Sequence, residues 1–109
     1  MVIYVDIDET ICRYDGVRNY PLALPMYERI NRINNLYEDG NKIVYWTARG
    51  STTKIDWTDL TKNQLQEWGV KYHELRMNHK PDYDLLICDK AVNSDNFFSN
   101  DDVCQKGKK

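Results

Sequence analysis

The chain alternates short apolar runs with longer amphipathic stretches, a pattern typical of an α/β fold. Runs rich in β-branched and aromatic residues at positions 2–7 and 42–46 predict two buried strands. Shorter runs at 70–77 and 84–88 predict two more. Because strands that alternate with helices form right-handed crossovers, we expect a mainly parallel central sheet in one layered domain.

Two stretches between these runs have the periodicity of amphipathic helices. Residues 22–39 predict the first helix, and Gly40 follows where a helix C-cap is expected. Four apolar side chains share one face of this helix: Met26, Ile30, Ile33 and Tyr37. Residues 56–68 predict the second helix, which Gly69 ends.

The composition indicates a single folded domain of ordinary polarity. Of the 109 residues, 41% are hydrophobic and 29% are charged, which is typical of a globular chain rather than a disordered one. We assign residues 1–99 to this domain. Residues 100–109 are polar and end in lysines, so we expect a frayed tail there.

Charge, hydropathy and cysteine usage limit the partners and the compartment. The formal net charge of −2 produces no strong field that favours nucleic acid or a membrane, although a local basic patch is compatible with it. No apolar run approaches the ~20 residues that span a bilayer, and the N-terminus lacks the basic region of a signal peptide. The three cysteines form no C-x-x-C pair, which indicates reduced thiols. We expect a cytoplasmic protein.

Polar residues follow the predicted strands at one edge of the sheet. Asp6 and Asp8 follow the first strand, Thr47 the second and Asp89 the fourth, while Lys80 precedes the fourth. Open α/β sheets bind ligands beyond the carboxyl ends of their strands, so these side chains are expected to converge. Carboxylates, a hydroxyl and an ammonium group together suit a phosphate and a hard divalent cation.

Each of these residue types has a chemical role in phosphoryl transfer. Asp6 is the candidate nucleophile, which forms an aspartyl-phosphate, and Asp8 is the candidate general acid and base. Thr47, with backbone N–H groups near Ala48, is expected to hold phosphate oxygens, and Lys80 to offset charge in the transition state. Magnesium is the expected cofactor, because it prefers oxygen ligands. The metal ligands expected are Asp6, Asp8 through its backbone carbonyl, and Asp89.

These motifs resemble the haloacid dehalogenase (HAD) superfamily. Its D-x-D-x-T motif matches residues 6–10, and its second motif, a hydrophobic strand that ends in Thr or Ser, matches residues 43–47. The lysine of the third motif corresponds to Lys80, and the acid of the fourth to Asp89. The four motifs occur in order across most of the chain, so their combination is far more specific than any one of them.

The resemblance extends to a small branch without a cap domain. The segments TARG, WGVKYHEL and DLLICDKAVN are similar to capsular polysaccharide or sugar-phosphate phosphatases. This implies a Rossmann-like three-layer sandwich, magnesium, and hydrolysis of phosphomonoesters. Between Thr10 and the first helix the chain has room only for a short β-hairpin flap. The open site then accepts a large substrate or is closed by a neighbouring subunit, so a homo-oligomer is one expectation.

Two positions depart from the pattern of the branch. Cys88 stands where a second acid usually precedes Asp89, and a thiol is a poor ligand for magnesium. Glu9 stands where glycine is common and adds a negative charge near the site. Metal binding therefore depends on Asp89 alone at this end of the site, or on ligands supplied through water.

Several residues have two interpretations in the sequence. Thr10, Ala48 and Arg49 are assigned to phosphate and substrate binding, but Arg49 is equally well explained as a solvated loop residue. Lys90 competes with Lys80 for the catalytic role, and we favour Lys80. The histidines are open as well: His73, inside a predicted strand, is expected to be structural, whereas His79 adjoins Lys80 and is either a substrate contact or a surface residue.

The leading functional hypothesis is a magnesium-dependent phosphomonoester hydrolase. Its expected substrate is a small phosphorylated metabolite, either a sugar phosphate or a nucleotide. An open site also permits a nucleic-acid end as the substrate, which would require basic residues around the site. A further alternative is a HAD scaffold that binds phosphate without turnover, disabled by the thiol of Cys88.

Overall fold

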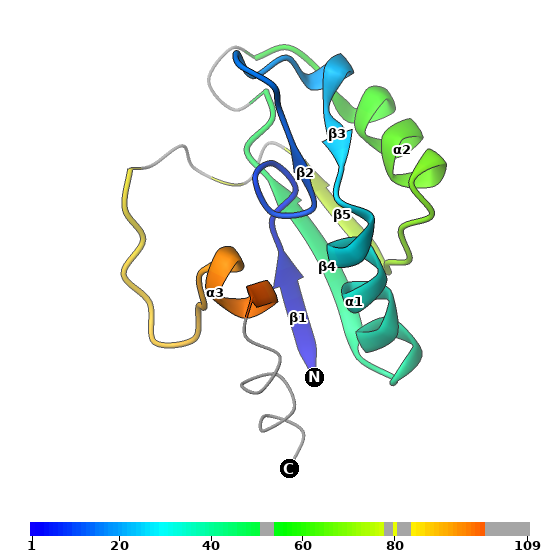
Figure 1. Cartoon of the computed structure of the whole chain (residues 1–109), viewed down its shortest axis with the longest axis vertical. Helices are drawn as coiled ribbons and strands as arrows, with labels where there is room; N and C mark the ends of the chain where they lie inside the picture. Colours follow the sequence, from blue (N-terminus) through cyan, green and yellow to red (C-terminus); the bar gives the residue numbers. More distant parts are fainter. Residues whose placement is uncertain (51–53, 78–79, 81–83, 100–109) are drawn as a thin grey trace.

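Three parallel strands form the central sheet of the described part of the chain. The computed structural model describes residues 1–50, 54–77, 80 and 84–99. Strands β1 (Val2–Val5), β4 (Lys42–Thr47) and β5 (Glu74–Met77) lie in the order β1-β4-β5, with parallel pairing throughout (Figure 1). Helix α1 (Tyr27–Glu38) connects β1 to β4, and α2 (Thr58–Glu67) connects β4 to β5. The predicted α/β class and mainly parallel sheet are confirmed.

A short antiparallel hairpin follows the first strand, as the flap prediction required. Strands β2 (Cys12–Arg13) and β3 (Leu24–Pro25) pair with each other, and a 3₁₀ turn, η1 (Tyr20–Leu22), lies between them. The predicted start of the first helix at residue 22 is wrong: α1 begins only at Tyr27. The reason is that Leu24–Pro25 pairs in the hairpin, and proline cannot donate the backbone hydrogen bond of a helix interior.

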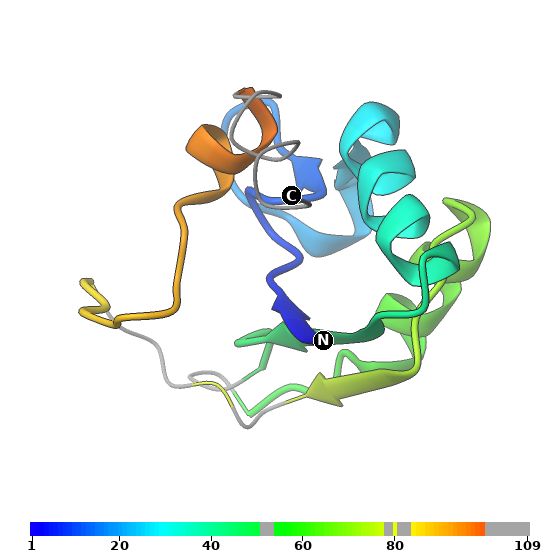
Figure 2. The ribbon, with the colours of Figure 1, turned by 90° about the horizontal axis from the view of Figure 1, so that it is seen from below.

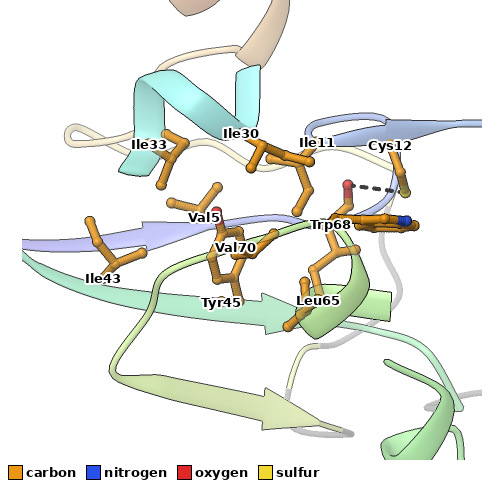
Figure 3. Packing of buried hydrophobic residues seen from close by; sticks show 11 residues of the cluster. Val5, Ile11, Cys12, Ile30, Ile33, Ile43, Tyr45, Leu65, Trp68 and Val70 are labelled. Atoms are coloured by element: carbon orange, nitrogen blue, oxygen red, sulfur yellow. Dashed lines mark hydrogen bonds between the residues drawn. The ribbon is translucent and has the colours of Figure 1, made fainter. Parts of the chain in front are cut away.

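The core lies between one face of the sheet and the two long helices. Because side chains alternate along a strand, Val5 on β1 and Ile43 and Tyr45 on β4 point to this face. Ile30 and Ile33 of α1 and Leu65 of α2 close over them (Figure 3). Figure 2 shows both helices on this side of the sheet. Burial of apolar surface of this kind is the main favourable term in folding. The predicted buried stripe of α1 is confirmed at both isoleucines.

The opposite face of the sheet is more open. Val2 and Tyr4 of β1 are exposed there, and Trp46 of β4 packs edge-on against Tyr4 at a centroid distance of 5.8 Å. Arg76 of β5 covers the Tyr4 ring, 5.3 Å from its centroid. Among the described helices, none is long and apolar enough to cross a membrane.

The fourth predicted strand does not form within the chain. Residues 84–88 are extended and exposed but belong to no strand (Figure 1). A parallel strand at the free edge of the sheet needs a crossover of about a dozen residues from the strand before it. Only positions 78–83 lie between the end of β5 and residue 84. The connection is therefore too short for residues 84–88 to join the sheet of their own chain as a parallel strand. The prediction of a fourth strand there is wrong.

Beyond the exposed segment the chain returns to its own domain as helix α3 (Ser94–Ser99). Asp95 pairs with Arg29 of α1 at 2.9 Å, and Arg32 donates to the carbonyl oxygen of Phe98 at 3.1 Å. The Ser94 hydroxyl lies 3.4 Å from the carbonyl oxygen of Glu9. Helix α3 is thus anchored to α1 and to the turn after β1. The predicted tail, residues 100–109, lies outside the described residues.

One core hydroxyl predicts a stabilising substitution. The Oη of Tyr45 is buried and has no hydrogen-bond partner within the described residues. Since a buried polar group without a partner costs free energy, Tyr45→Phe is expected to raise the free energy of unfolding by about 1 kcal/mol. Urea unfolding of both proteins measures this difference. Tyr27→Phe, at an exposed tyrosine of α1, is the control and should change nothing; a destabilised Tyr45→Phe protein would show that the hydroxyl has a partner.

Candidate functional site

The first group of the candidate site is an ion pair at the carboxyl end of the sheet. Asp6 directly follows β1, and the ammonium group of Lys80 contacts its carboxylate. The Lys80 side chain is 10% exposed, whereas that of Asp6 is 42% exposed, so solvent reaches the acid but hardly its partner. The Lys80 nitrogen also lies 5.5 Å from the centroid of the Trp46 ring. The Lys80 ammonium group offsets the negative charge of the accessible Asp6 carboxylate, and it can donate charge-assisted hydrogen bonds to an anionic ligand that approaches the acid.

A tight turn directs the second acid away from the first. The backbone N–H groups of Thr10 and Ile11 both donate to the carbonyl oxygen of Ile7, at 3.2 and 2.9 Å. Glu9, which lies within this turn between Ile7 and Thr10, has a φ of 63°, in the left-handed region that favours glycine. This explains physically why glycine suits this position better than glutamate. The turn carries the Asp8 side chain under the hairpin and leaves that of Asp6 at the surface.

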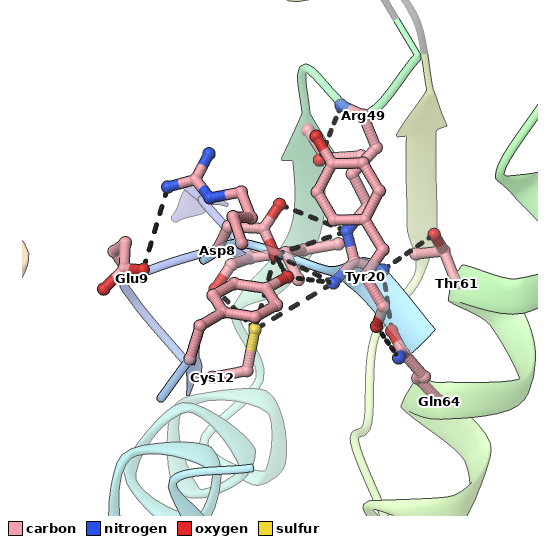
Figure 4. A network of polar contacts seen from close by, with 11 residues as sticks. Asp8, Glu9, Cys12, Tyr20, Arg49, Thr61 and Gln64 are labelled. Carbon is pink, nitrogen blue, oxygen red and sulfur yellow. Dashed lines mark hydrogen bonds and ion pairs between the residues drawn. The ribbon is translucent and has the colours of Figure 1, made fainter. Parts of the chain in front are cut away.

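Asp8 is held by a buried arginine (Figure 4). The Nε of Arg49 donates to Oδ2 of Asp8 at 3.1 Å, and Nη2 donates to Oδ1 at 2.8 Å. This is a two-pronged charge-assisted pair, the strongest common form of side-chain hydrogen bonding. The Tyr14 hydroxyl donates to Oδ1 as well. Arg49 in the loop after β4 and Tyr14 in the hairpin together fix the position of the Asp8 carboxylate.

The rest of the Arg49 guanidinium is also occupied by protein atoms. Its Nη1 donates to Oγ1 of Thr61 at 3.0 Å and to Oε1 of Gln64 at 2.7 Å, both on α2. The ring of Tyr20 lies 4.8 Å from the guanidinium carbon. Nε and both Nη groups thus all have partners, and the side chain is buried. The structure places Arg49 as the anchor of Asp8, neither in solvent nor free for a phosphate.

The electrostatics of this cluster follow from the pairing. Burial alone raises the pKa of Asp8, but the hydrogen bonds and charge of Arg49, aided by Tyr14, outweigh it and hold that pKa below its usual 3.8. Burial likewise lowers the pKa of Arg49, and Asp8 more than reverses the shift. Burial, with the Asp8 charge, raises the pKa of the Cys12 thiol to about 12. Asp8 is therefore an ionised carboxylate and Cys12 a neutral thiol near pH 7.

The remaining predicted site residues lie in different surroundings. The Thr47 side chain is buried, and its Oγ1 accepts a hydrogen bond from the backbone N–H of Arg49 at 3.1 Å. Ala48 lies between them and is half-buried. The Thr10 carbonyl oxygen accepts from Nη1 of Arg29 at 3.2 Å. The Thr47 hydroxyl retains its own proton for donation, which a phosphate oxygen could accept.

The two lysines differ in their surroundings, and one of the histidines has a defined contact. Lys80 contacts Asp6, whereas Lys90 is exposed in the segment that leaves the sheet. His73 accepts a hydrogen bond from the backbone N–H of Ile43 through Nδ1 at 3.1 Å and stacks on Tyr37. That contact is the structural role expected for His73. His79 lies outside the described residues.

The acids predicted to bind magnesium are not gathered in this chain. Within residues 1–50, 54–77, 80 and 84–99, no three His, Cys, Asp or Glu side chains form a group that could hold a metal ion. Asp6 contacts Lys80, Asp8 contacts Arg49, and Asp89 is exposed in the extended segment. The side chains of one chain, as arranged here, do not fit the expected ion. The prediction that Asp89 joins Asp6 and Asp8 stays a prediction.

Comparison with known proteins shows the fold and leaves the function open. The chain matches a solved structural-genomics target from Vibrio cholerae with a TM-score of 0.80 and 23% sequence identity. The match covers 99% of this chain and 98% of the other. No protein-family model and no curated protein matches the sequence. The described part of the chain therefore has the fold of that bacterial protein.

The buried pair predicts a large loss of stability when one partner is removed. Arg49→Met leaves the carboxylate of Asp8 buried without its counter-charge, so the free energy of unfolding should fall by about 3–5 kcal/mol. Denaturant unfolding measures it. Arg13→Met is the matched control, because Arg13 forms an exposed pair with Asp15 at 2.7 Å. Equal, small effects of the two substitutions would contradict the assignment of Arg49 as an anchor.

The lowered pKa of Asp8 predicts a specific loss of stability in acid. A carboxyl whose pKa is lower in the folded state contributes stability above its unfolded pKa, near 3.8, and loses it as the pH falls through the folded pKa. As the pH falls below about 5, the free energy of unfolding should thus fall more steeply for the wild type than for Asp8→Asn. Denaturant unfolding at several pH values tests this; parallel curves would mean that Asp8 is not the titrating group.

Proposed function

We propose that this protein is a phosphomonoester hydrolase of the HAD type, with Asp6 as its nucleophile. The observation that supports this most directly is the contact between Asp6 and Lys80, which are 74 positions apart in sequence. In the HAD superfamily, which the sequence resembles, the lysine of the third motif is expected beside the first acid of the first motif, here Asp6. The exposure of the Asp6 carboxylate gives a phosphate access to it, while Lys80 and the Thr47 hydroxyl are groups that can bind phosphate oxygens.

The proposed reaction has two displacement steps at phosphorus. A carboxylate oxygen of Asp6 forms a bond to phosphorus while the bond from phosphorus to the ester oxygen breaks, and that oxygen leaves with the electron pair. Water then attacks phosphorus, and the bond to Asp6 breaks, which releases inorganic phosphate. Lys80 reduces the repulsion between the Asp6 carboxylate and the anionic substrate in both steps.

The environment of Asp8 determines which proton transfers are favourable. Because Arg49 keeps Asp8 ionised, Asp8 is prepared to accept the proton of the hydrolytic water in the second step. In the same state it has no proton to give to the leaving oxygen. The first step then favours esters whose oxygen leaves as a stable anion, such as aryl phosphates, over alkyl phosphates.

The substrate class follows from the resemblance to capless phosphatases, which favours a sugar phosphate or a nucleotide. Of the arginines near the site, Arg18, which is half-exposed and lies 3.8 Å from Glu9, is the one that a nucleic-acid end could contact. Arg49 is buried in the Asp8 cluster, and Arg13 is paired with Asp15. The magnesium requirement stays part of the proposal. No step above depends on a metal, because the acids among the described residues form no group that could hold one.

The test is a turnover assay with a nucleophile variant. The purified protein is assayed with Mg²⁺ and after chelation, against p-nitrophenyl phosphate, sugar phosphates, nucleotides and phosphorylated oligonucleotides. Turnover should fall by several orders of magnitude in Asp6→Asn, since the first bond to phosphorus cannot form. We expect p-nitrophenyl phosphate to be cleaved faster than the alkyl phosphates.

The matched control is Asp15→Asn, which removes an exposed carboxylate from the hairpin loop and should leave turnover unchanged. A folded wild-type protein that cleaves none of these esters would refute the hydrolase and favour a phosphate-binding scaffold. Retained turnover in Asp6→Asn would refute the nucleophile.

A further inference from the structure

We propose that the functional unit is a strand-exchanged dimer, in which residues 84–89 of one copy pair in parallel with β1 of a second copy. The exchange brings Asp89 of each copy to Asp6 of the other. The exchange itself is argued from the fold. The role given to Asp89, as a ligand of the divalent cation, rests on the proposed function.

The exchanging segment has the sequence of a buried strand and the exposure of a surface loop. Every residue from 84 to 93 is exposed, including three consecutive apolar ones, Leu85, Leu86 and Ile87. The exposed fraction of Ile87 is 88%. A run of this kind favours pairing with a sheet edge, because pairing buries its apolar side chains and satisfies its backbone. Within one copy the described structure offers it no strand partner.

The matching surface is the outer edge of β1. This strand ends the sheet order β1-β4-β5, so one side of its backbone has no strand neighbour in the described residues. The neighbouring side chains on the open face, Val2 and Tyr4, are exposed apolar groups. An unpaired edge with apolar side chains is the usual site for addition of a strand from another chain.

The short connection between Lys80 and residue 84 prevents residues 84–89 from pairing in parallel with β1 of the same copy. To bring Asp89 beside Asp6, residues 84–89 must run parallel to β1 and end at its carboxyl end. Lys80 is already at that end, in contact with Asp6, and only positions 81–83 separate it from residue 84. They cannot lead back to the amino end of the sheet and reverse. In one copy, residues 84–89 therefore cannot pair in parallel with β1 so that Asp89 lies opposite Asp6.

A second copy removes this restriction through two-fold symmetry. In the view of Figure 1 the segment runs from the level of the carboxyl end of β1 towards its amino end, opposite to β1. A two-fold axis perpendicular to the sheet reverses β1 in the second copy, so that the same segment is parallel to it. Exchange of an identical element between copies is a low-cost route to a dimer.

The position of α3 agrees with a segment 84–89 that ends near the carboxyl end of β1, where Asp6 lies. Ser94 contacts the turn at Glu9, three residues after Asp6, and Asp89 is five residues before Ser94. A chain of that length spans at most about 17 Å, so α3 docked at this turn keeps Asp89 within reach of the Asp6 edge. In the exchanged dimer α3 makes the same contacts on the second copy.

The pairing has a defined register. With Asp89 opposite Asp6, Ile87 is opposite Tyr4 and Leu85 is opposite Val2, on the open face of the sheet. Leu86 and Cys88 then face the core side, next to Ile3 and Val5. All the apolar side chains of the segment gain cover, and Asp6 gains a second carboxylate that can serve as a ligand of a divalent cation.

Complementation between two defective chains tests the exchange directly. Asp6→Asn and Asp89→Asn are each expected to bind Mn²⁺, a spectroscopic substitute for Mg²⁺, far more weakly than the wild type. Refolded together, they form mixed dimers in which one site has both substitutions and the other has neither. About a quarter of the wild-type Mn²⁺ sites should return, as measured by electron paramagnetic resonance, and phosphatase turnover should return with them.

The oligomeric state is measured on the same proteins by light scattering after size exclusion. The wild type should have twice the mass of one chain, and Ile87→Asp the mass of one chain. Val17→Asp is the matched control, since Val17 is as exposed as Ile87 but lies in the hairpin loop, and it should stay dimeric.

Thiol crosslinking tests the register in a Cys88→Ser, Cys104→Ser background. Tyr4→Cys with Ile87→Cys should give a covalent dimer, as should Val2→Cys with Leu85→Cys. The displaced pair, Val2→Cys with Ile87→Cys, should not. A crosslink formed only within one chain would overturn the exchange and indicate an antiparallel strand in the same copy.

The outcomes separate the exchange from the proposed function. Returned Mn²⁺ sites and a dimeric mass without any ester cleavage would leave the exchange standing and refute the phosphatase. Ester cleavage by a monomeric wild type, with no recovery after mixing, would refute the exchange and leave the phosphatase standing. A dimer that Ile87→Asp does not dissociate would also refute the exchange.

Discussion

The buried pair between Asp8 and Arg49 is the interaction on which the site depends most. It joins the turn after β1, the loop after β4, helix α2 and the hairpin, because Arg49 also contacts Thr61, Gln64 and the Tyr20 ring. A guanidinium can connect so many elements since its five donors are fixed in one plane. Desolvation makes such a pair costly to bury, so its benefit is in positioning more than in net stability.

That constraint separates two acids that the sequence places two residues apart. Asp8 is fixed, ionised and buried, whereas Asp6 is accessible and contacts the ammonium group of Lys80. The strand geometry alone would give both side chains the same face. The tight turn at Glu9 and the ion pair with Arg49 place the Asp8 side chain in different surroundings from that of Asp6. The proposed nucleophile and the proposed base thereby have different environments, which is how two carboxylates take different roles in one reaction.

The sequence was sufficient for what depends on local pattern and strand order. Apolar periodicity predicted both long helices and the three paired strands, and strand ends predicted Asp6, Thr47 and Lys80 at one edge. The role of Arg49 was not predictable in this way. Its partners come from α2 and the hairpin, and nothing in the sequence reports how far each side chain rotates towards the turn. The late start of α1 has a local cause, the pairing of Leu24–Pro25, which the 3.6-residue periodicity conceals.

The fourth predicted strand is the most informative difference, because its composition favours a strand and the connection before it does not allow one in the same sheet. Residues 84–88 have every local property of a strand, yet positions 78–83 are too few for a parallel crossover. A segment with strong strand propensity and no route to its own sheet is a conflict between local and global preference, which natural sequences rarely keep. Pairing with a second copy satisfies both, since it supplies the edge without the crossover. In the proposed dimer, the separation of Asp89 from Asp6 within one chain and the exposure of the apolar segment have one common cause.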